Sequence, residues 1–285
     1  MGFLVAIANA VVVSVQDVLV KKLKGENNFF LIWLRMVTAL PVLALLVAVF
    51  SSWKLPGLAF WLLIFGVNVP LEVTQFYVGY TAIQRSPLSL MAPLSSFTSI
   101  FLIPVGYVVL GELPSRIGLV GVLAIVIGTF FLGWVSGGRG VLGAFRNVFS
   151  EPGIWLVTIA TFLTAISITV AKFTFQYASP MLTAFYLVAA LGLVLTPLAF
   201  WKPAAVPAQR RRTLFSALGL ASGLSFGLHY TGLSLLPAVY FISVKRVSVL
   251  FNVLWGKLIF QEEHAMQRLM GVLLMVVGII LIAIG

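Results

Sequence analysis

Ten runs of apolar residues, each long enough to cross a lipid bilayer, follow one another along the chain with only short breaks between them. A transmembrane helix needs about 20 mainly apolar residues, because the hydrocarbon core of a bilayer is about 30 Å thick. Only 9% of the residues are charged, and the mean hydropathy is +1.13, which excludes a water-soluble domain. We therefore expect an all-α membrane protein with ten transmembrane helices. The runs lie near residues 3–23, 29–50, 58–80, 87–110, 115–135, 153–177, 180–201, 213–235, 237–260 and 266–285.

The second half of the chain repeats the first with a shift of 150 residues. The shift aligns Tyr80-Thr81 with Tyr230-Thr231, Pro87 with Pro237, Phe101 with Phe251, Gly106 with Gly256, Glu112 with Glu262, Gly121-Val122-Leu123 with Gly271-Val272-Leu273, and Gly128 with Gly278. This register predicts five-helix repeats over 1–135 and 153–285, joined by an amphipathic linker over 136–152. Because each repeat has an odd number of helices, the second inserts upside down, as in alternating-access transporters.

The repeated segments resemble the EamA-like branch of the drug/metabolite transporter superfamily. The resemblance rests on Tyr80-Thr81-Ala82, Pro87, Pro93, Leu110-Gly111-Glu112, Gly118 and Gly121, and on Tyr230-Thr231-Gly232, Pro237, Phe260-Gln261-Glu262 and Gly271. It implies a ten-helix carrier whose central cavity is lined by the first, third, fourth, sixth, eighth and ninth helices. In the same resemblance Glu112 and Glu262 are motif residues, which we interpret as structural.

Two adjacent cations, Lys245 and Arg246, lie about nine residues into the ninth run. At this depth their charged groups cannot easily reach the membrane–water interface. A charge at the bilayer centre costs about 2.5–3.5 kcal/mol, so it calls for a functional or structural partner. In a continuous helix Lys245, Ser248, Asn252 and Gly256 share one face, which predicts a polar stripe along a wet cavity. The Lys-Arg pair also resembles the phosphate-holding pair of triose-phosphate-type translocators, although the fourth run has no matching lysine.

A carboxylate, Glu72, lies near the middle of the third run, two residues after Pro70. A buried carboxylate beside a helix kink suits proton coupling, and a permanent ion pair with Arg35 or Arg246 is the structural alternative. The candidate substrate contacts are Lys245, Arg246, Arg35, Gln75, Asn252 and Tyr240. The candidate coupling residues are Glu72, Asp17 and His229, with a packing role as the alternative for His229.

Other classes of function lack the residues they need. There is no cysteine, and the two histidines are far apart, so we expect no metal site and no cofactor. The net charge of +11 does not indicate a nucleic-acid partner, because the cations lie mainly in the short connections. An enzyme would need a catalytic cluster that the sequence does not show. We predict a secondary transporter of a small polar, anionic metabolite, driven by protons or a counter-substrate and acting as a monomer or homodimer. The alternatives are a lipid-phosphate flippase, an exporter of amino acids or neutral metabolites, and a channel.

Charge and family resemblance disagree about orientation in what we expect to be a prokaryotic inner membrane. Eleven cations lie in the odd-numbered connections and two, Lys54 and Arg116, in the even-numbered ones. The positive-inside rule then places both termini outside, which we favour, whereas the resemblance implies cytoplasmic termini.

Overall fold

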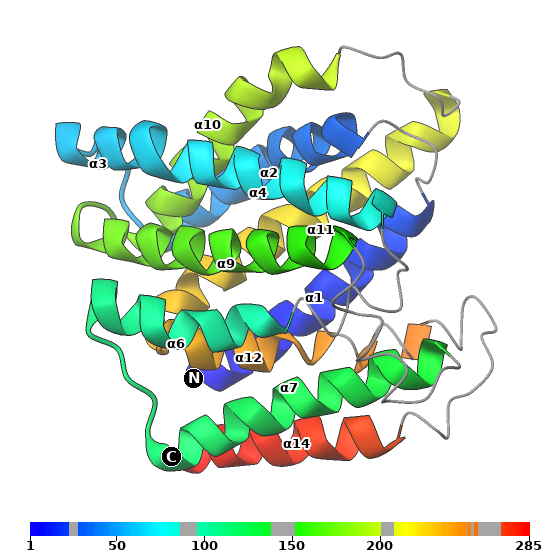
Figure 1. The fold of residues 1–285 in the computed structure, drawn as a ribbon. Coiled ribbons are helices and arrows are strands. Elements are labelled where there is room, and N and C mark those ends of the chain that lie inside the picture. The colour runs from blue at the N-terminus through cyan, green and yellow to red at the C-terminus, as the bar shows by residue number, and fades with distance from the viewer. Residues whose placement is uncertain are drawn as a thin grey trace. The chain divides into compact units, whose positions relative to one another are not determined.

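A computed structural model describes residues 1–22, 28–85, 96–137, 152–200, 208–248, 250–251, 254–255 and 269–285. These residues form helices and their connections (Figure 1). The helices are α1 (Gly2–Lys22), α2 (Asn28–Phe50), α3 (Leu58–Leu63), the π-helical turn η1 (Ile64–Asn68), α4 (Val69–Arg85), α6 (Phe97–Leu110), α7 (Arg116–Gly137), α9 (Pro152–Phe173), the 3₁₀ turn η2 (Thr174–Gln176), α10 (Pro180–Ala199), α11 (Ala208–Leu235), α12 (Ala238–Lys245) and α14 (Leu269–Ile284).

The prediction of an all-α membrane protein is confirmed. Among the described residues, five helices are long and apolar enough to cross a membrane, namely those over Gly2–Val20, Phe29–Phe50, Leu58–Val78, Trp155–Gln176 and Pro180–Ala199. Shorter apolar helices cover Phe97–Leu110, Arg116–Thr129 and Leu273–Ile284. Residues 138–151, on which most of the predicted linker falls, lie outside the described residues.

The chain divides into two compact units, and each combines segments from both halves of the sequence. Unit 1 comprises Met1–Val73 and Val170–Leu235, and unit 2 comprises Thr74–Thr169 and Leu236–Gly285. The five-helix repeats over 1–135 and 153–285 therefore describe a regularity of the sequence and stay a prediction as domains.

Unit 1 is built around α2, which packs against α10 and α11, while α1 packs against α11. A glycine stripe on α11 allows the close approach of α2. A Cβ added to Gly219 would lie 2.6 Å from the Cβ of Thr38, and one on Gly227 would lie 2.6 Å from a methyl group of Leu46. Between them, Gly223 lies against Val42. This four-residue spacing of glycines is typical of membrane helices whose backbones pack closely.

In unit 2, α7 and α14 run side by side (Figure 1). Glycines make this contact, because a Cβ on Gly121 would lie 2.6 Å from the carbonyl oxygen of Gly278. In the same way, a Cβ on Gly128 would lie 2.7 Å from the carbonyl oxygen of Gly271. Since Gly271 and Gly278 are the repeat mates of Gly121 and Gly128, the two contacts are equivalent under the 150-residue repeat.

The Gly-Glu motif of the first half joins α6 to α12. Gly111 ends α6 with a positive φ of 68°, a conformation that glycine adopts without strain. The next residue, Glu112, accepts a hydrogen bond of 2.8 Å at its Oε2 from the backbone N–H of Ala238, the first residue of α12. The carboxylate thus satisfies one of the N–H groups that a helix start leaves without an intrahelical partner. This geometry is in line with the structural interpretation of Glu112.

Within the ninth run, α12 ends at Lys245. The Arg246 N–H keeps a 3.2 Å bond to the Ile242 carbonyl four residues earlier, but the backbone also tightens here, because N–H groups bond to carbonyls three residues earlier. The bonds run from Arg246 to Ser243 (3.1 Å), from Val247 to Val244 (3.0 Å) and from Leu250 to Val247 (2.9 Å). A 3₁₀ stretch inside a longer helix often marks a functional hinge or a site of strain.

Candidate functional site

The cation Arg246 is held at the point where α12 ends. Its Nη2 donates a 3.1 Å hydrogen bond to the hydroxyl of Thr98 on the first turn of α6, and α6 and α12 pack together in unit 2. The 150-residue repeat pairs Arg246 with Ser96, and that serine also begins a tight turn, since the Ser99 N–H bonds to the Ser96 carbonyl at 3.0 Å. The hydrogen bond between Arg246 and Thr98 therefore joins two tight turns that are equivalent under the 150-residue repeat.

Buried hydroxyl groups surround this contact on both helices. On α6 and its N-cap, Ser96, Thr98 and Ser99 are at most 1% exposed. On the other side, Ser243 is fully buried one turn before Arg246, and Ser248 is 8% exposed. Within the described part of the chain, the hydroxyls of Ser99 and Ser243 have no hydrogen-bond partner. A cation beside hydroxyl donors at a helix N-terminus is an arrangement that suits an anion.

Helix capping alone does not account for the two cations. A positive charge in the last turn of a helix gains about 0.3–1 kcal/mol from the helix dipole. That gain is smaller than the cost of about 2.5–3.5 kcal/mol for placing a cation at the bilayer centre. Both Lys245 and Arg246 are half-buried in unit 2.

Two other residues of the ninth run, Tyr240 and Asn252, are predicted to contact the substrate. The hydroxyl of Tyr240 accepts a 2.7 Å hydrogen bond from the backbone N–H of Ser115, which precedes α7, and it packs against Gly118. Tyr240 thus holds α12 against α7, and its contact with substrate stays a prediction. Asn252 lies outside the described residues, so the predicted polar stripe is described only at Lys245 and Ser248.

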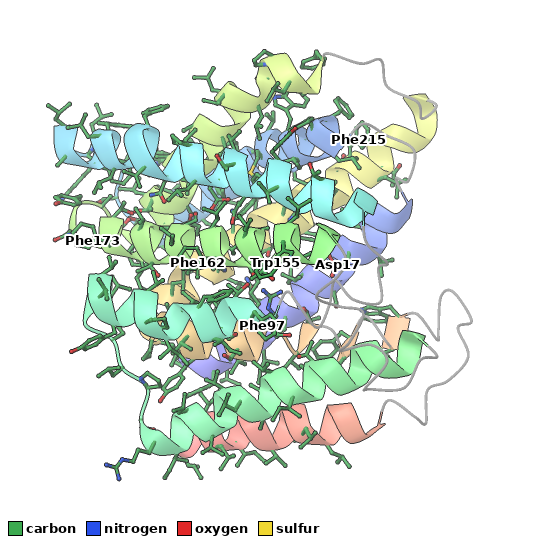
Figure 2. The ribbon with its side chains drawn as sticks, in the orientation of Figure 1. Asp17, Phe97, Trp155, Phe162, Phe173 and Phe215 are labelled. Atoms are coloured by element: carbon green, nitrogen blue, oxygen red, sulfur yellow. The ribbon has the colours of Figure 1, made fainter. Side chains whose placement is uncertain are left out.

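Unit 1 contains the candidate coupling residues. Glu72 is half-buried on α4 and interacts electrostatically with Tyr230 of α11, a residue only 5% exposed. The ring of His229 lies 5.5 Å from that of Tyr230, in an edge-to-face arrangement. Asp17 is exposed on α1 (Figure 2). The coupling roles of Glu72, Asp17 and His229 stay predictions.

The remaining predicted substrate contacts belong to different units. Arg35 is half-buried on α2, in unit 1. Gln75 is half-buried on α4 and belongs to unit 2, because the division between the units falls after Val73. The structure therefore groups Gln75, Tyr240, Lys245 and Arg246 in unit 2 and Arg35, Asp17, Glu72 and His229 in unit 1.

The sequence analysis missed several buried polar groups. Between α1 and α11, the Asn9 side chain donates to the Ser225 carbonyl at 2.6 Å, and the Gln16 side chain donates to the Ser222 hydroxyl at 2.8 Å. Asn68 in η1, on the helix face that also carries Glu72 and Gln75, is fully buried as well. An average of hydropathy over a spanning run does not single out these side chains. An amide within such a run nevertheless indicates a functional or structural role.

The aromatic residues of α6 and α9 pack together in unit 2. The ring of Phe162, which is labelled in Figure 2, lies 5.4 Å from that of Phe101 in an edge-to-face arrangement. Such aromatic pairs add packing energy beyond the area they bury. The contact joins α9 to the same helix, α6, whose first turn carries Thr98.

Comparisons with known proteins agree with this architecture. The sequence pattern of the EamA-like transporter family matches residues 1–134 and 151–284. One solved crystal structure superposes on the chain with a TM-score of 0.79 at 14% identity, covering 98% of this chain and 95% of that one, which shows a shared fold. No curated protein matches the chain. The protein is thus a member of the EamA-like transporter family, an integral membrane protein that transports a small-molecule substrate.

Proposed function

We propose that this protein is a secondary transporter that carries a small anionic metabolite, bearing a phosphate or carboxylate group, across a prokaryotic inner membrane by alternating access. The observation that supports the proposal best is the Arg246–Thr98 hydrogen bond of 3.1 Å at the break after α12. It holds the guanidinium group of Arg246, next in sequence to Lys245, at the first turn of α6, on which the Ser99 side chain is fully buried.

The chemistry of this group favours an oxyanion. A guanidinium carries five N–H donors in a planar fork, and the Thr98 contact uses one of them. Lys245 adds a point charge, and the serine hydroxyls can donate to oxygen atoms. A Lys-Arg pair binds phosphates and carboxylates by charge-assisted hydrogen bonds, each worth about 1.5–3 kcal/mol. A neutral substrate would not form such bonds with the two cations.

Transport is driven in this proposal by a proton that binds Glu72. An ionisable residue within a membrane span is a functional candidate by default, and a carboxylate that gains and loses a proton is a common coupling group. Glu72 is half-buried, and it interacts electrostatically with Tyr230, which is 5% exposed. Exchange against a counter-substrate is the alternative. Transport by Glu72→Gln under a pH gradient distinguishes exchange from proton coupling.

The first experiment identifies the substrate and tests its charge. Thermal-shift screening of the purified protein against sugar phosphates, amino acids and organic acids should select anions. Lys245→Met keeps most of the side-chain stem and removes the charge, so it should weaken binding of the selected anion about 10- to 100-fold, roughly 1.4 kcal/mol per tenfold. Lys54→Met is the matched control, because Lys54 is exposed in the connection between α2 and α3. Selection of neutral or cationic compounds in place of anions would refute the anionic substrate, and unchanged affinity of Lys245→Met for a selected anion would refute the role of Lys245.

A second variant tests the shape of the anion contact. Arg246→Lys keeps the charge and loses the fork, so it should weaken a phosphate or carboxylate substrate and leave a neutral ligand unaffected. Selection of a long-chain lipid phosphate over its water-soluble headgroup would favour a flippase and contradict the metabolite proposal.

A further inference from the structure

The strongest unexplained feature of unit 1 is the π-helical turn η1 (Ile64–Asn68), which joins α3 to α4. The Val69 N–H bonds to the carbonyl of Ile64, five residues earlier, so the backbone is wider here than in an α-helix. Asn68 is fully buried, and neither its Oδ1 nor its Nδ2 has a hydrogen-bond partner among the residues that the structure describes. Turns of this kind occur frequently at functional sites.

An amide buried without partners is costly, since each unsatisfied polar group loses its hydration. The missing partner must satisfy both ends of the Asn68 side chain. A metal ion would suit Oδ1 but would meet the positive end of the Nδ2–H bonds, and a carboxylate would suit only Nδ2. A water molecule or an undissociated carboxyl group can both donate and accept, so one of these is the chemically matched partner.

The nearest ionisable side chain along the helix is Glu72, one turn after Asn68. Residues four apart on a helix have Cβ atoms about 5–6 Å apart, a separation that one bridging water can span. Pro70, between them, cannot donate a backbone hydrogen bond. The sequence thus places an amide and a carboxyl group on neighbouring turns of the helix.

The described residues around η1 and Glu72 include few charged side chains. Helix α10 packs against η1, and its titratable residue is Tyr186, which donates its hydroxyl proton to the carbonyl of Lys54 at 3.3 Å. Helix α11 contributes Tyr230, which interacts electrostatically with Glu72, and the adjacent His229. The other charged side chains described within the spans of unit 1 are Asp17, Arg35 and Lys172.

We propose that η1 binds a water molecule through both amide atoms of Asn68 and that this water bridges to the Glu72 carboxyl group. The water is the hydrogen-bonded partner through which a proton reaches and leaves Glu72, so this part of the inference rests on the proposed proton coupling. Asn68 is then a positioning residue for the coupling carboxyl. The water site itself is independent of whether transport uses protons.

The first test is a structure of the purified full-length protein at a resolution that shows ordered water. We expect density within hydrogen-bond distance of Oδ1 and Nδ2 of Asn68, and its persistence in Glu72→Gln, since the amide supplies two of its contacts. The density should be absent in Asn68→Leu, which has a similar volume and no polar atoms. A wild-type structure in which another side chain contacts both amide atoms, or in which the position is empty, overturns the proposal without any variant.

The second test reads the carboxyl group directly by infrared difference spectroscopy of the purified protein during a pH change. The band that disappears in Glu72→Gln identifies the protonated Glu72 carboxyl. Asn68→Leu should move that band to higher frequency, because the carboxyl loses its hydrogen-bonded water. An unchanged band in a folded Asn68→Leu protein refutes the bridge. Failure of proton-driven transport in the wild type, with the water and the band shift present, would instead refute the proposed coupling.

Discussion

Substituting the glycines between α7 and α14 should loosen unit 2 by an amount that follows from the contact distances. A Cβ on Gly121 would lie 2.6 Å from the Gly278 carbonyl oxygen, whereas ordinary contacts begin at 3.4 Å, so Gly121→Ala requires the helices to separate by about 0.8 Å. A gap of about 0.5–1 Å already loses a quarter to a half of the dispersion energy of the contacts it opens. Overpacking of this kind costs about 1–3 kcal/mol.

The matched control is Gly106→Ala on α6, in the same unit, where an added Cβ would meet nothing within 4 Å. Alanine is favoured over glycine in a helix by about 0.8–1 kcal/mol in both variants, so the comparison cancels this gain. We expect Gly121→Ala to unfold several degrees below Gly106→Ala, at roughly 2–4 °C per kcal/mol.

Thermal unfolding of the detergent-purified variants measures this difference, and the repeat adds a second comparison. Gly278→Ala should be destabilised as much as Gly128→Ala, because the two residues are repeat mates and an added Cβ would lie 2.6 Å and 2.7 Å, respectively, from the facing carbonyl oxygen. Gly121→Ala and Gly278→Ala open the same contact, so the double variant should cost less than the sum of the single variants. Equal melting temperatures for Gly121→Ala and Gly106→Ala would refute the close-packing argument.

Three further predictions address the α12 cap, coupling and orientation. Glu112→Ala should lower the free energy of unfolding of the purified protein by about 0.5–2 kcal/mol, because the Ala238 N–H at the start of α12 loses its acceptor. Glu112→Gln should recover part of this loss. An unchanged melting temperature of Glu112→Ala would show that the cap contributes nothing to stability. Glu72→Gln should abolish uphill transport driven by a pH gradient in proteoliposomes while exchange of labelled for unlabelled substrate continues; a wild-type response to the gradient would make Glu72 structural. A fluorescent protein fused to the C-terminus should stay dark in bacterial cells, since the eleven-to-two distribution of cations places both termini outside, and bright cells would contradict that orientation.

The helices, their apolar character and the repeat could be predicted from the sequence alone. Spanning length is a sum of transfer free energies along consecutive residues, so a local reading of hydropathy is sufficient to find the runs. The inverted order follows from the odd number of runs in each half. The positions of Lys245, Arg246 and Glu72 within the runs were equally visible, because charges are rare in membrane spans.

Only the tertiary structure decided where the helices change their hydrogen-bond register. The runs around Asn68 and Arg246 were both recognised as apolar, yet one contains a π-helical turn and the other contains bonds to carbonyls three residues earlier. These registers differ by one residue in the acceptor of each N–H group, a choice made by packing against other helices and not by hydropathy. The contact of Arg246 with Thr98 has the same origin, because it joins residues 148 apart in the chain.

The glycines separate the two kinds of information most clearly. Their recurrence at 121, 128, 271 and 278 was part of the sequence repeat, but glycine matches between membrane helices are common and carry little weight by themselves. In the structure, Gly121 lies against Gly278 and Gly128 against Gly271. The sequence determined that these positions are equivalent. The tertiary structure determined that they touch, because helices in lipid associate through close van der Waals contact, which depends on the distance between two backbones.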